Sequence, residues 1–273
     1  MAREIINKNQ IWPLKEAKIL IVDNESINSE VIQIHLENAG YKNIICSSAP
    51  KQAVEIIKAE QPNLLLVAMM MPGISGIDVL EAMQTHDQLK NTSVIIITSS
   101  TDSELKQRAL GLGVSDFLSR PIDESELILR VKNTLMAKAY EGSIQDRASG
   151  VTYDDAKDHR TTTDSEESAK RSGALVCQLS LENPRIRALV ERFRVRLSDQ
   201  LNAMGVAWQE RNFEELSSLA HWLKGAGGTV GYLAFTDPAR ELELLAKAKK
   251  ENDIEGAIAA LHELAHRIVL PGE

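Results

Sequence analysis

Three short apolar runs decide the fold of the first half of the chain: Ile19-Leu20-Ile21-Val22, Leu64-Leu65-Leu66-Val67 and Val94-Ile95-Ile96-Ile97. Weaker runs lie at 44–45 and 116–118. Continuous aliphatic and β-branched runs are typical of strands buried on both faces, as in parallel sheets. Because these five runs alternate with helical patterns, we expect a doubly wound α/β domain with a five-stranded parallel sheet over residues 17–138. The predicted helices are 27–39, 50–60, 76–85, 102–112 and 123–138.

Residues 184–273 show helical periodicity and no strand pattern. The second of the four helical patterns opens with Asn212 followed by Glu215, which is a capping-box-like start, and the fourth opens in the same way with Asn252 and Glu255. Short connections between four amphipathic helices predict an antiparallel four-helix bundle. The patterns begin near Ile186, Asn212, Thr236 and Asn252.

The segment between these regions has a different composition. From Glu141 to Gly173 the only large apolar residues are Ile144, Val151 and Tyr153, which is too few to offset the entropy lost on ordering. We therefore expect an N-terminal extension over 1–16 and a flexible linker over 139–183. A flexible coil of that length has a reach of about 35–40 Å, which permits the two domains of one chain to dock on each other.

Composition excludes several classes of protein. The 273 residues carry a formal net charge of -8, which argues against nucleic-acid binding through a broad basic surface. The two cysteines, Cys46 and Cys177, exclude a disulfide scaffold. The longest apolar run, 64–71, is too short to span a membrane, and the N-terminus has no apolar signal region. We expect a cytoplasmic protein without a nucleic-acid or membrane partner.

Residues at the carboxyl ends of the predicted strands are the place to look for a ligand site. The motifs at 21–25 (Ile-Val-Asp-Asn-Glu), 70–76 (Met-Met-Pro-Gly-Ile-Ser-Gly), 96–99 (Ile-Ile-Thr-Ser) and 117–121 (Phe-Leu-Ser-Arg-Pro) together resemble the response-regulator receiver domain. That resemblance implies a phosphate-accepting Asp four residues before the Met-Pro proline and two acidic residues that hold Mg²⁺. It also implies a Thr or Ser and a Lys that contact the phosphoryl group.

The sequence departs from this pattern where the chemistry lies. Ala68 stands at the acceptor position, Asn24 replaces one of the acidic pair and Arg120 replaces the Lys, while Asp23 and Thr98 match. A methyl group cannot accept phosphate, and one carboxylate is a poor anchor for Mg²⁺. We therefore expect a degenerate receiver domain that is not phosphorylated, binds Mg²⁺ weakly or not at all, and acts as an interaction or regulatory module. The alternative is an engineered Asp-to-Ala change at position 68, although it does not explain Asn24 and Arg120.

A histidine in the bundle lies opposite the apolar face of its helix. On a helical wheel the core face is an arc of about 120° that excludes His221 and contains Leu216, Leu219, Trp222, Leu223, Ala226 and Val230. Lys224, Gly225 and Gly228 share the outer face with His221. Glycines in a helix interior cost about 1 kcal/mol each against alanine. Gly225 and Gly228 thus favour close approach by a partner, although a plain solvated histidine is the alternative.

The segment from His221 to Gly231 resembles the signature of the histidine-phosphotransfer (HPt) domain, and Ala239-Arg240-Glu241-Leu242-Glu243 is similar to that family's third helix. The resemblance implies that His221 accepts a phosphoryl group and that Lys224 supports it. The partners would be receiver domains of response regulators or hybrid histidine kinases, which supply the aspartyl phosphate and Mg²⁺. The bundle would then need no cofactor, and with no ATP-binding or kinase segment visible the chain is expected to be a phosphocarrier rather than an enzyme.

Two other interpretations have to be weighed. The protein could be an adaptor that binds two-component proteins without carrying phosphate. His262-Glu263-Leu264-Ala265-His266 also fits the zinc-protease motif H-E-x-x-H, but a catalytic zinc needs a third ligand. Because the sole later candidate is Glu273, we expect no metal there.

Overall fold

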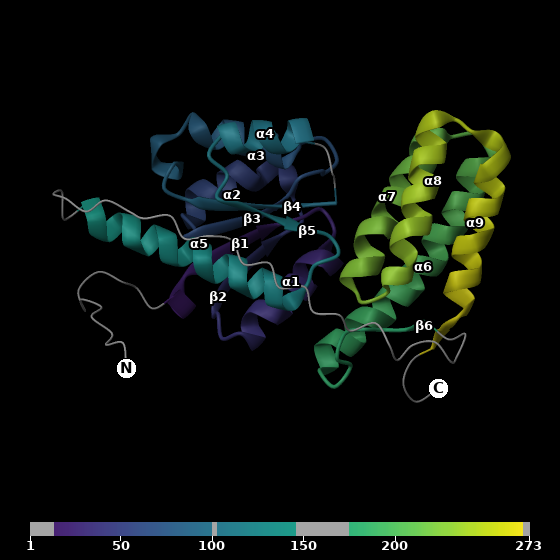
Figure 1. Ribbon diagram of the computed structural model, residues 1–273, viewed down its shortest axis with the longest axis horizontal. Coiled ribbons are helices and arrows are strands. Elements are labelled where there is room, and N and C mark those ends of the chain that lie inside the picture. The colour runs from purple at the N-terminus through teal and green to yellow at the C-terminus, as the bar shows by residue number, and fades with distance from the viewer. Residues whose placement is uncertain (1–13, 100–102, 146–174, 270–273) are drawn as a thin grey trace.

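The computed structural model describes residues 14–99, 103–145 and 175–269, which form two domains (Figure 1). The first domain contains the predicted five-stranded parallel sheet, with the strand order β2-β1-β3-β4-β5. Because the strands are parallel and lie in this order, the carboxyl ends of β1, β3, β4 and β5 lie next to one another at one edge of the sheet. The strands are β1 (Lys18–Val22), β2 (Asn43–Ser47), β3 (Leu64–Ala68), β4 (Ser93–Thr98) and β5 (Asp116–Ser119).

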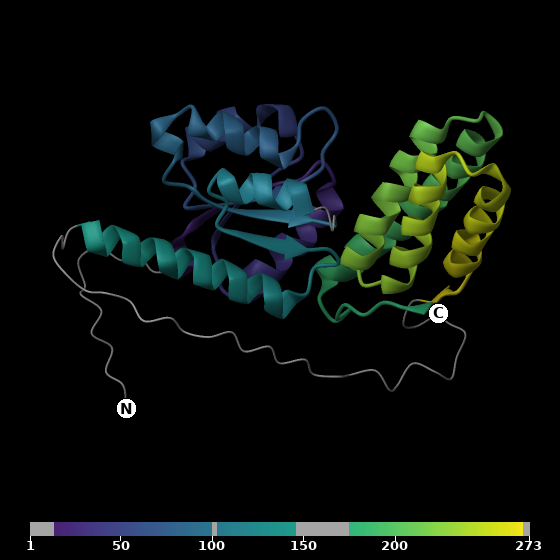
Figure 2. The ribbon, with the colours of Figure 1, turned by 45° about the horizontal axis from the view of Figure 1, so that its top comes forward.

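Helices cover both faces of this sheet (Figure 2). Residues of α1 (Ser26–Asn38) and α5 (Glu124–Gln145) pack on one face, and residues of α2 (Ala53–Glu60), α3 (Gly76–Gln84) and α4 (Ser103–Gly111) pack on the other. Two helix bounds of this domain differ from prediction by more than one residue. Pro50 begins a 3₁₀ turn (Pro50–Gln52) ahead of α2, and α5 continues to Gln145 instead of ending at 138. Further 3₁₀ turns are Leu14–Glu16 and Asp87–Leu89.

The second domain contains the four predicted helices: α6 (Pro184–Gln209), α7 (Phe213–Thr229), α8 (Thr236–Ala248) and α9 (Glu251–His266), with a 3₁₀ turn at Leu233–Phe235. The cap at Asn212 is confirmed, because its side chain accepts a hydrogen bond of 3.1 Å from the Glu215 amide. The cap at Asn252 is wrong. Lys249 turns into the left-handed region with φ 51°, so α9 begins at Glu251 and Asn252 lies inside it.

The prediction of a bundle region without strands is also wrong. Leu175–Val176 (β6) and Ile268–Val269 (β7) form a short parallel pair. Leu175 and Ile268 pack against the bundle core, and Cys177 and Leu181 are buried in it, so burial orders a segment that composition alone assigned to the linker. The rest of that segment, 146–174, lies outside the described residues, as do residues 1–13 of the predicted N-terminal extension. Within the described ranges, no helix is long and apolar enough to cross a membrane.

The loop after β3 is fixed by a close approach of α3. A capping box begins this helix, since the Ser75 side chain accepts a hydrogen bond from the Asp78 amide and Asp78 accepts one from the Ser75 amide. The Gly76 amide donates to the carbonyl of Met69 at 2.9 Å. A Cβ on Gly76 would lie 2.7 Å from the carbonyl oxygen of Ala68. Glycine thus lets the helix begin directly against the end of β3.

We predict that Gly76→Ala lowers the free energy of unfolding by about 1–3 kcal/mol, because the clash is with backbone that cannot move aside. The matched control is Gly111→Ala in α4, where an added Cβ meets nothing within 4 Å. The control is expected to leave stability unchanged or to raise it by up to about 1 kcal/mol. Urea unfolding followed by circular dichroism measures both, and equal effects of the two substitutions would contradict the prediction.

Candidate functional site

A buried ion pair lies at the carboxyl edge of the sheet. Asp23 follows β1 and Arg120 follows β5, and the Arg120 guanidinium pairs with the Asp23 carboxylate. The Asp23 side chain is 1% exposed. It also accepts a hydrogen bond of 2.8 Å from the Glu25 amide, and Asn28 Nδ2 lies 3.4 Å from it. The single carboxylate at the strand ends is therefore already neutralised by the chain's own arginine.

The other strand-end residues lie around the same pair. Ala68 ends β3 and Thr98 ends β4, and both are buried. Asn24 donates a hydrogen bond of 3.1 Å to Glu25 Oε1. A cavity of about 420 Å³ is lined by all five predicted strand-end residues, namely Asp23, Asn24, Ala68, Thr98 and Arg120. The structure thus brings the predicted residues together, around a methyl group at Ala68.

These residues do not fit Mg²⁺. The ion requires octahedral oxygen ligation with one or two carboxylates as anchors. Ala68 has no oxygen in its side chain, Asn24 is a neutral amide, and the guanidinium of Arg120 holds the carboxylate of Asp23. A cation at Asp23 would have to displace Arg120 and would then lie next to its positive charge.

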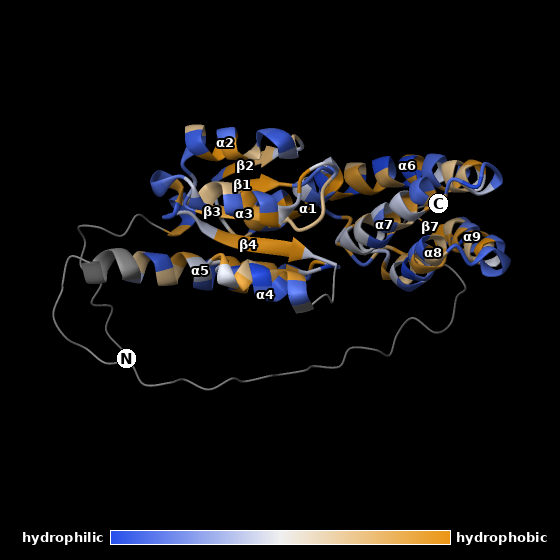
Figure 3. Ribbon diagram, turned by 90° about the horizontal axis from the view of Figure 1, so that it is seen from above, coloured by the Kyte–Doolittle hydropathy of each residue, from blue (hydrophilic) through white to orange (hydrophobic). Residues whose placement is uncertain are grey.

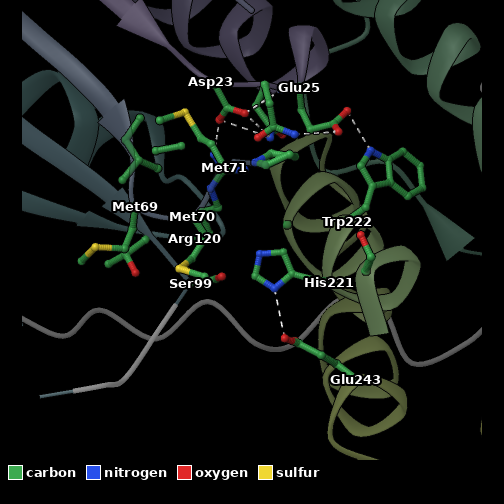
Figure 4. A pocket seen from close by; sticks show the side chains of 18 of the residues that line it. Asp23, Glu25, Met69, Met70, Met71, Ser99, Arg120, His221, Trp222 and Glu243 are labelled. Carbon is green, nitrogen blue, oxygen red and sulfur yellow. Dashed lines mark hydrogen bonds and ion pairs between the residues drawn. The ribbon is translucent and has the colours of Figure 1, made fainter. Parts of the chain in front are cut away.

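His221 of α7 lines the same cavity from the bundle side. Its Nδ1 lies 3.1 Å from Oε1 of Glu243 on α8, and its side chain is 37% exposed. Figure 4 shows the imidazole between Glu243 and the residues of the sheet edge, with its second nitrogen on the side of Arg120 and Ser99. The histidine that the sequence analysis named as a candidate acceptor thus faces the predicted strand-end residues.

Sequence reasoning did not single out Glu243, which the structure places in contact with His221. Its carboxylate is 6% exposed and accepts hydrogen bonds from Lys224 Nζ at 2.6 Å and from Lys247 Nζ at 2.5 Å, besides its contact with His221. The residue lies in the motif 239–243 that resembles the third HPt helix. The sequence therefore did mark the segment that contains Glu243. Spacing along α8 does not show, however, which residue of α7 the Glu243 side chain contacts.

The protonation of Glu243 determines the tautomer of His221. Burial acts to raise the pKa of Glu243, but hydrogen bonds from His221, Lys224 and Lys247 outweigh burial and hold the pKa far below its usual value. Glu243 is therefore ionised and can only accept hydrogen bonds. Nδ1 of His221 must then carry a proton. This leaves the lone pair on Nε2, the nitrogen that faces the cavity.

The two glycines of α7 that were predicted to share the outer face with His221 are not exposed, so that expectation is corrected. Gly225 and Gly228 are both buried, because the first domain lies over them. A Cβ on Gly225 would lie 3.3 Å from an Arg120 guanidinium nitrogen, and one on Gly228 would lie 2.7 Å from Pro121 Cβ. The glycines do admit a close neighbour, but that neighbour belongs to the same chain.

Helix α1 makes much of the contact between the domains, since it packs on α6 and α7 (Figure 3). Ile27, Val31 and Ile34 follow the i, i+4, i+7 spacing of one helix stripe and are buried together with the bundle core. The opposite stripe, with Ile32 and Leu36, packs on the sheet. One helix therefore belongs to the cores of both domains.

Three ion pairs border this apolar stripe. The Arg192 guanidinium pairs with Glu30 and the Arg185 guanidinium with Glu37, while Arg196 lies 2.7 Å from Glu25. The acidic partners lie on or just before α1 and the arginines on α6. Exposed ion pairs contribute at most about 1 kcal/mol each, so they orient the contact more than they hold it together.

Trp222 joins this boundary next to the candidate phosphoacceptor. Its indole nitrogen donates a hydrogen bond of 3.0 Å to Glu25 Oε2, and the guanidinium of Arg196 lies 4.8 Å from the centre of its ring. Trp222 also stacks on Phe193 of the bundle core. The residue predicted as core is therefore the point where the core meets the first domain.

The zinc-like motif lies elsewhere. His262 and His266 line a separate cavity that also involves Arg194 and Leu197. In the ranges 14–99, 103–145 and 175–269, no group of three or more His, Cys, Asp or Glu residues is placed to hold a metal. Glu273 lies outside the described residues.

Comparison with known families finds a match for each domain. Residues 19–132 match the response regulator receiver domain, and residues 188–269 match the Hpt domain. The first match coincides with the α/β domain and the second with the bundle.

Two curated relatives are similar to part of the chain. The phosphate regulon transcriptional regulatory protein PhoB of Pseudomonas aeruginosa is 30% identical over 146 residues, 54% of this chain and 63% of that protein. The transcriptional regulatory protein CrdR of Helicobacter pylori is 32% identical over 117 residues, 43% of this chain and 54% of that protein. The chain thus spans between half and two thirds of these relatives. The solved receiver domain of the Francisella response regulator 1452 is 26% identical, with 45% of this chain and 98% of that chain covered at a TM-score of 0.41.

We predict that Glu243→Gln lowers the free energy of unfolding by about 2 kcal/mol at pH 7, because three donors lose an ionised acceptor. The lowered pKa of Glu243 means that its contribution is complete above the pKa of the unfolded chain and declines as the pH falls below it. The difference between wild type and variant should therefore shrink as the pH falls below about 4.5. Urea unfolding at several pH values measures it, with Glu241→Gln at an exposed position of α8 as the control. A difference that is independent of pH would contradict the assignment.

We further predict that Val31→Glu separates the domains, because a carboxylate would be buried in the apolar stripe that joins α1 to the bundle. The radius of gyration from small-angle X-ray scattering should rise while the circular dichroism spectrum stays that of two folded domains. Asn38→Glu adds the same charge at an exposed position of the same helix and should leave the radius unchanged. An unchanged radius for Val31→Glu would show that the stripe does not hold the domains together.

Proposed function

We propose that this chain is a phosphocarrier of a two-component system. The Hpt domain would accept a phosphoryl group on Nε2 of His221 and pass it on. The receiver-like domain, which has no acceptor at Ala68, would serve as an interaction and regulatory module. The partners would be receiver domains of response regulators or of hybrid histidine kinases.

The observation that carries this proposal is the contact between His221 and Glu243. An ionised carboxylate 3.1 Å from Nδ1 holds the proton on that nitrogen and leaves Nε2 as the nucleophile. The lone pair of Nε2 attacks the phosphorus of a partner's aspartyl phosphate. The N–P bond forms as the P–O bond to the aspartate breaks, and the partner regains a free carboxylate. Glu243 then stabilises the positive charge that develops on the imidazole.

Lys224 and Mg²⁺ have different roles in this proposal. Lys224 is 11% exposed and pairs with Glu243, so it stabilises the carboxylate that orients His221, and it lies one helical turn from the acceptor. The receiver-like domain offers no acceptor and no ligand set for Mg²⁺. The partner receiver would therefore supply both the aspartyl phosphate and any Mg²⁺ that its own site requires.

Docking within the chain would regulate this transfer. A partner receiver has to bring its aspartyl phosphate to Nε2, which is the side of His221 that Arg120 and the strand-end cavity cover (Figure 4). A partner receiver and the chain's own receiver-like domain therefore cannot occupy this side of His221 at the same time. Transfer would therefore require the receiver-like domain to move away from α7.

A second candidate is an adaptor that binds two-component proteins and carries no phosphate. The partial burial of His221 by its own chain favours it, since a permanently covered histidine could not meet a partner. The adaptor and the phosphocarrier differ in whether label appears on His221.

We predict that a panel of phosphorylated receiver domains transfers label to the wild-type protein and not to His221→Gln. Glutamine keeps a polar side chain that can still meet Glu243 but has no nucleophilic ring nitrogen. His262→Gln, in the zinc-like motif, is the matched control and should be labelled like the wild type. Absence of label from every receiver would favour the adaptor, and label that persists in His221→Gln would place the acceptor elsewhere.

A further inference from the structure

We propose that the strand-end cavity of the receiver-like domain binds the phosphoryl group of phosphorylated His221 in the same chain, with Arg120 as its counter-charge. The degenerate receiver site would then be a phosphohistidine-binding site. This rests on the proposed function, because it needs a phosphoryl group on His221, and it adds a ligand for the site that lacks its own acceptor.

The cavity has the right place for this ligand. It is lined both by the sheet edge and by α7, so a group on Nε2 of His221 would extend into it. Ala68 contributes only a methyl group to its lining. Polar side chains at the wall can donate hydrogen bonds to phosphoryl oxygens, among them Asn24, Ser99 and Ser217.

The charge of the site also suits a phosphoryl group without a metal. The five strand-end residues contain one carboxylate, Asp23, and one guanidinium, Arg120, so together they are neutral. A carboxylate at position 68 or 24 would repel the dianion at short range. The other inner carboxylates already have cationic partners: Glu25 pairs with Arg196, and Glu243 pairs with Lys224 and Lys247. Glu214 is exposed, two helical turns before His221.

Arg120 can hold both groups at once. One terminal nitrogen of its guanidinium pairs with Asp23. The other lies 3.3 Å from the position that a Cβ on Gly225 would take, which is one turn of α7 after His221. Arginine presents donors in a planar fork that suits phosphoryl oxygens. The phosphoryl group would thus gain a charge-assisted hydrogen bond without leaving Asp23 unpaired.

Such binding would protect phosphorylated His221. Hydrolysis requires a water oxygen to attack phosphorus as the N–P bond breaks, which releases inorganic phosphate and returns a proton to the ring. A docked receiver-like domain would limit the approach of that water. The phosphoryl group would be stored until the domains separate and a partner receiver takes it.

The test is the lifetime of the phosphohistidine in the full-length protein. Phosphoramidate serves as a small phosphoryl donor that needs no partner, and ³¹P NMR or phosphate-affinity electrophoresis follows decay after its removal. The half-life should be on the order of tenfold shorter in Arg120→Gln, the factor expected for loss of one charge-assisted hydrogen bond. Val31→Glu, which is expected to separate the domains, should shorten the half-life similarly, and Arg120→Lys should give a half-life between those of Arg120→Gln and the wild type.

A double variant guards against simple unfolding. Asp23→Asn with Arg120→Gln removes both charges together, so no buried charge is left unpaired, and its melting temperature checks the fold. It should show the same short half-life. Equal half-lives in wild type, Arg120→Gln and Val31→Glu would overturn the inference. Faster labelling of Val31→Glu with an unchanged half-life would also overturn it, because the receiver-like domain would then cover His221 without binding its phosphoryl group. If wild type takes no label, or if label remains in His221→Gln, the proposed function itself has failed.

Discussion

The buried ion pair between Asp23 and Arg120 determines the charge of the site where the two domains meet and the position of the guanidinium in it. The pair neutralises the one carboxylate that remains at the strand ends, so the site is held together by the chain's own cation. It also fixes the guanidinium against α7, where Gly225 leaves room for it. The neutral charge of the strand-end edge and its close approach to His221 both depend on this contact. A lysine would supply the charge but not the two-sided fork.

The second constraint is the buried carboxylate of Glu243. A carboxylate at this depth is costly unless hydrogen bonds and cations surround it, and here it has three donors from α7 and α8. The same network that makes its burial tolerable also orients the imidazole and assigns the proton to Nδ1. The hydrogen bonds that join α7 to α8 in this bundle therefore also set the orientation and the tautomer of His221.

Much of the fold could be predicted from local pattern. The five apolar runs gave the five strands to within a few residues, because a strand buried on both faces leaves a continuous signature. The four bundle helices followed from periodicity and from the cap at Asn212. Errors arose where long-range packing outweighed local pattern. β6 forms because Leu175 and Ile268 meet on the bundle, and Asn252 lies within α9 because the turn at Lys249 comes earlier in the chain.

The sequence by itself determined which side chains the site contains: an imidazole at His221, a methyl group at Ala68, an amide at Asn24 and a guanidinium at Arg120. These identities limit the chemistry wherever the residues lie. Only the tertiary structure decided that they share one cavity, that Glu243 meets His221, and that the stripe of Ile27, Val31 and Ile34 belongs to the bundle core. The apolar residues of α1 serve two cores, and periodicity shows that a face is apolar but not which surface covers it. Contacts between residues almost 200 positions apart depend on how the two domains pack, and the local spacing of residue types in the sequence does not reveal that packing.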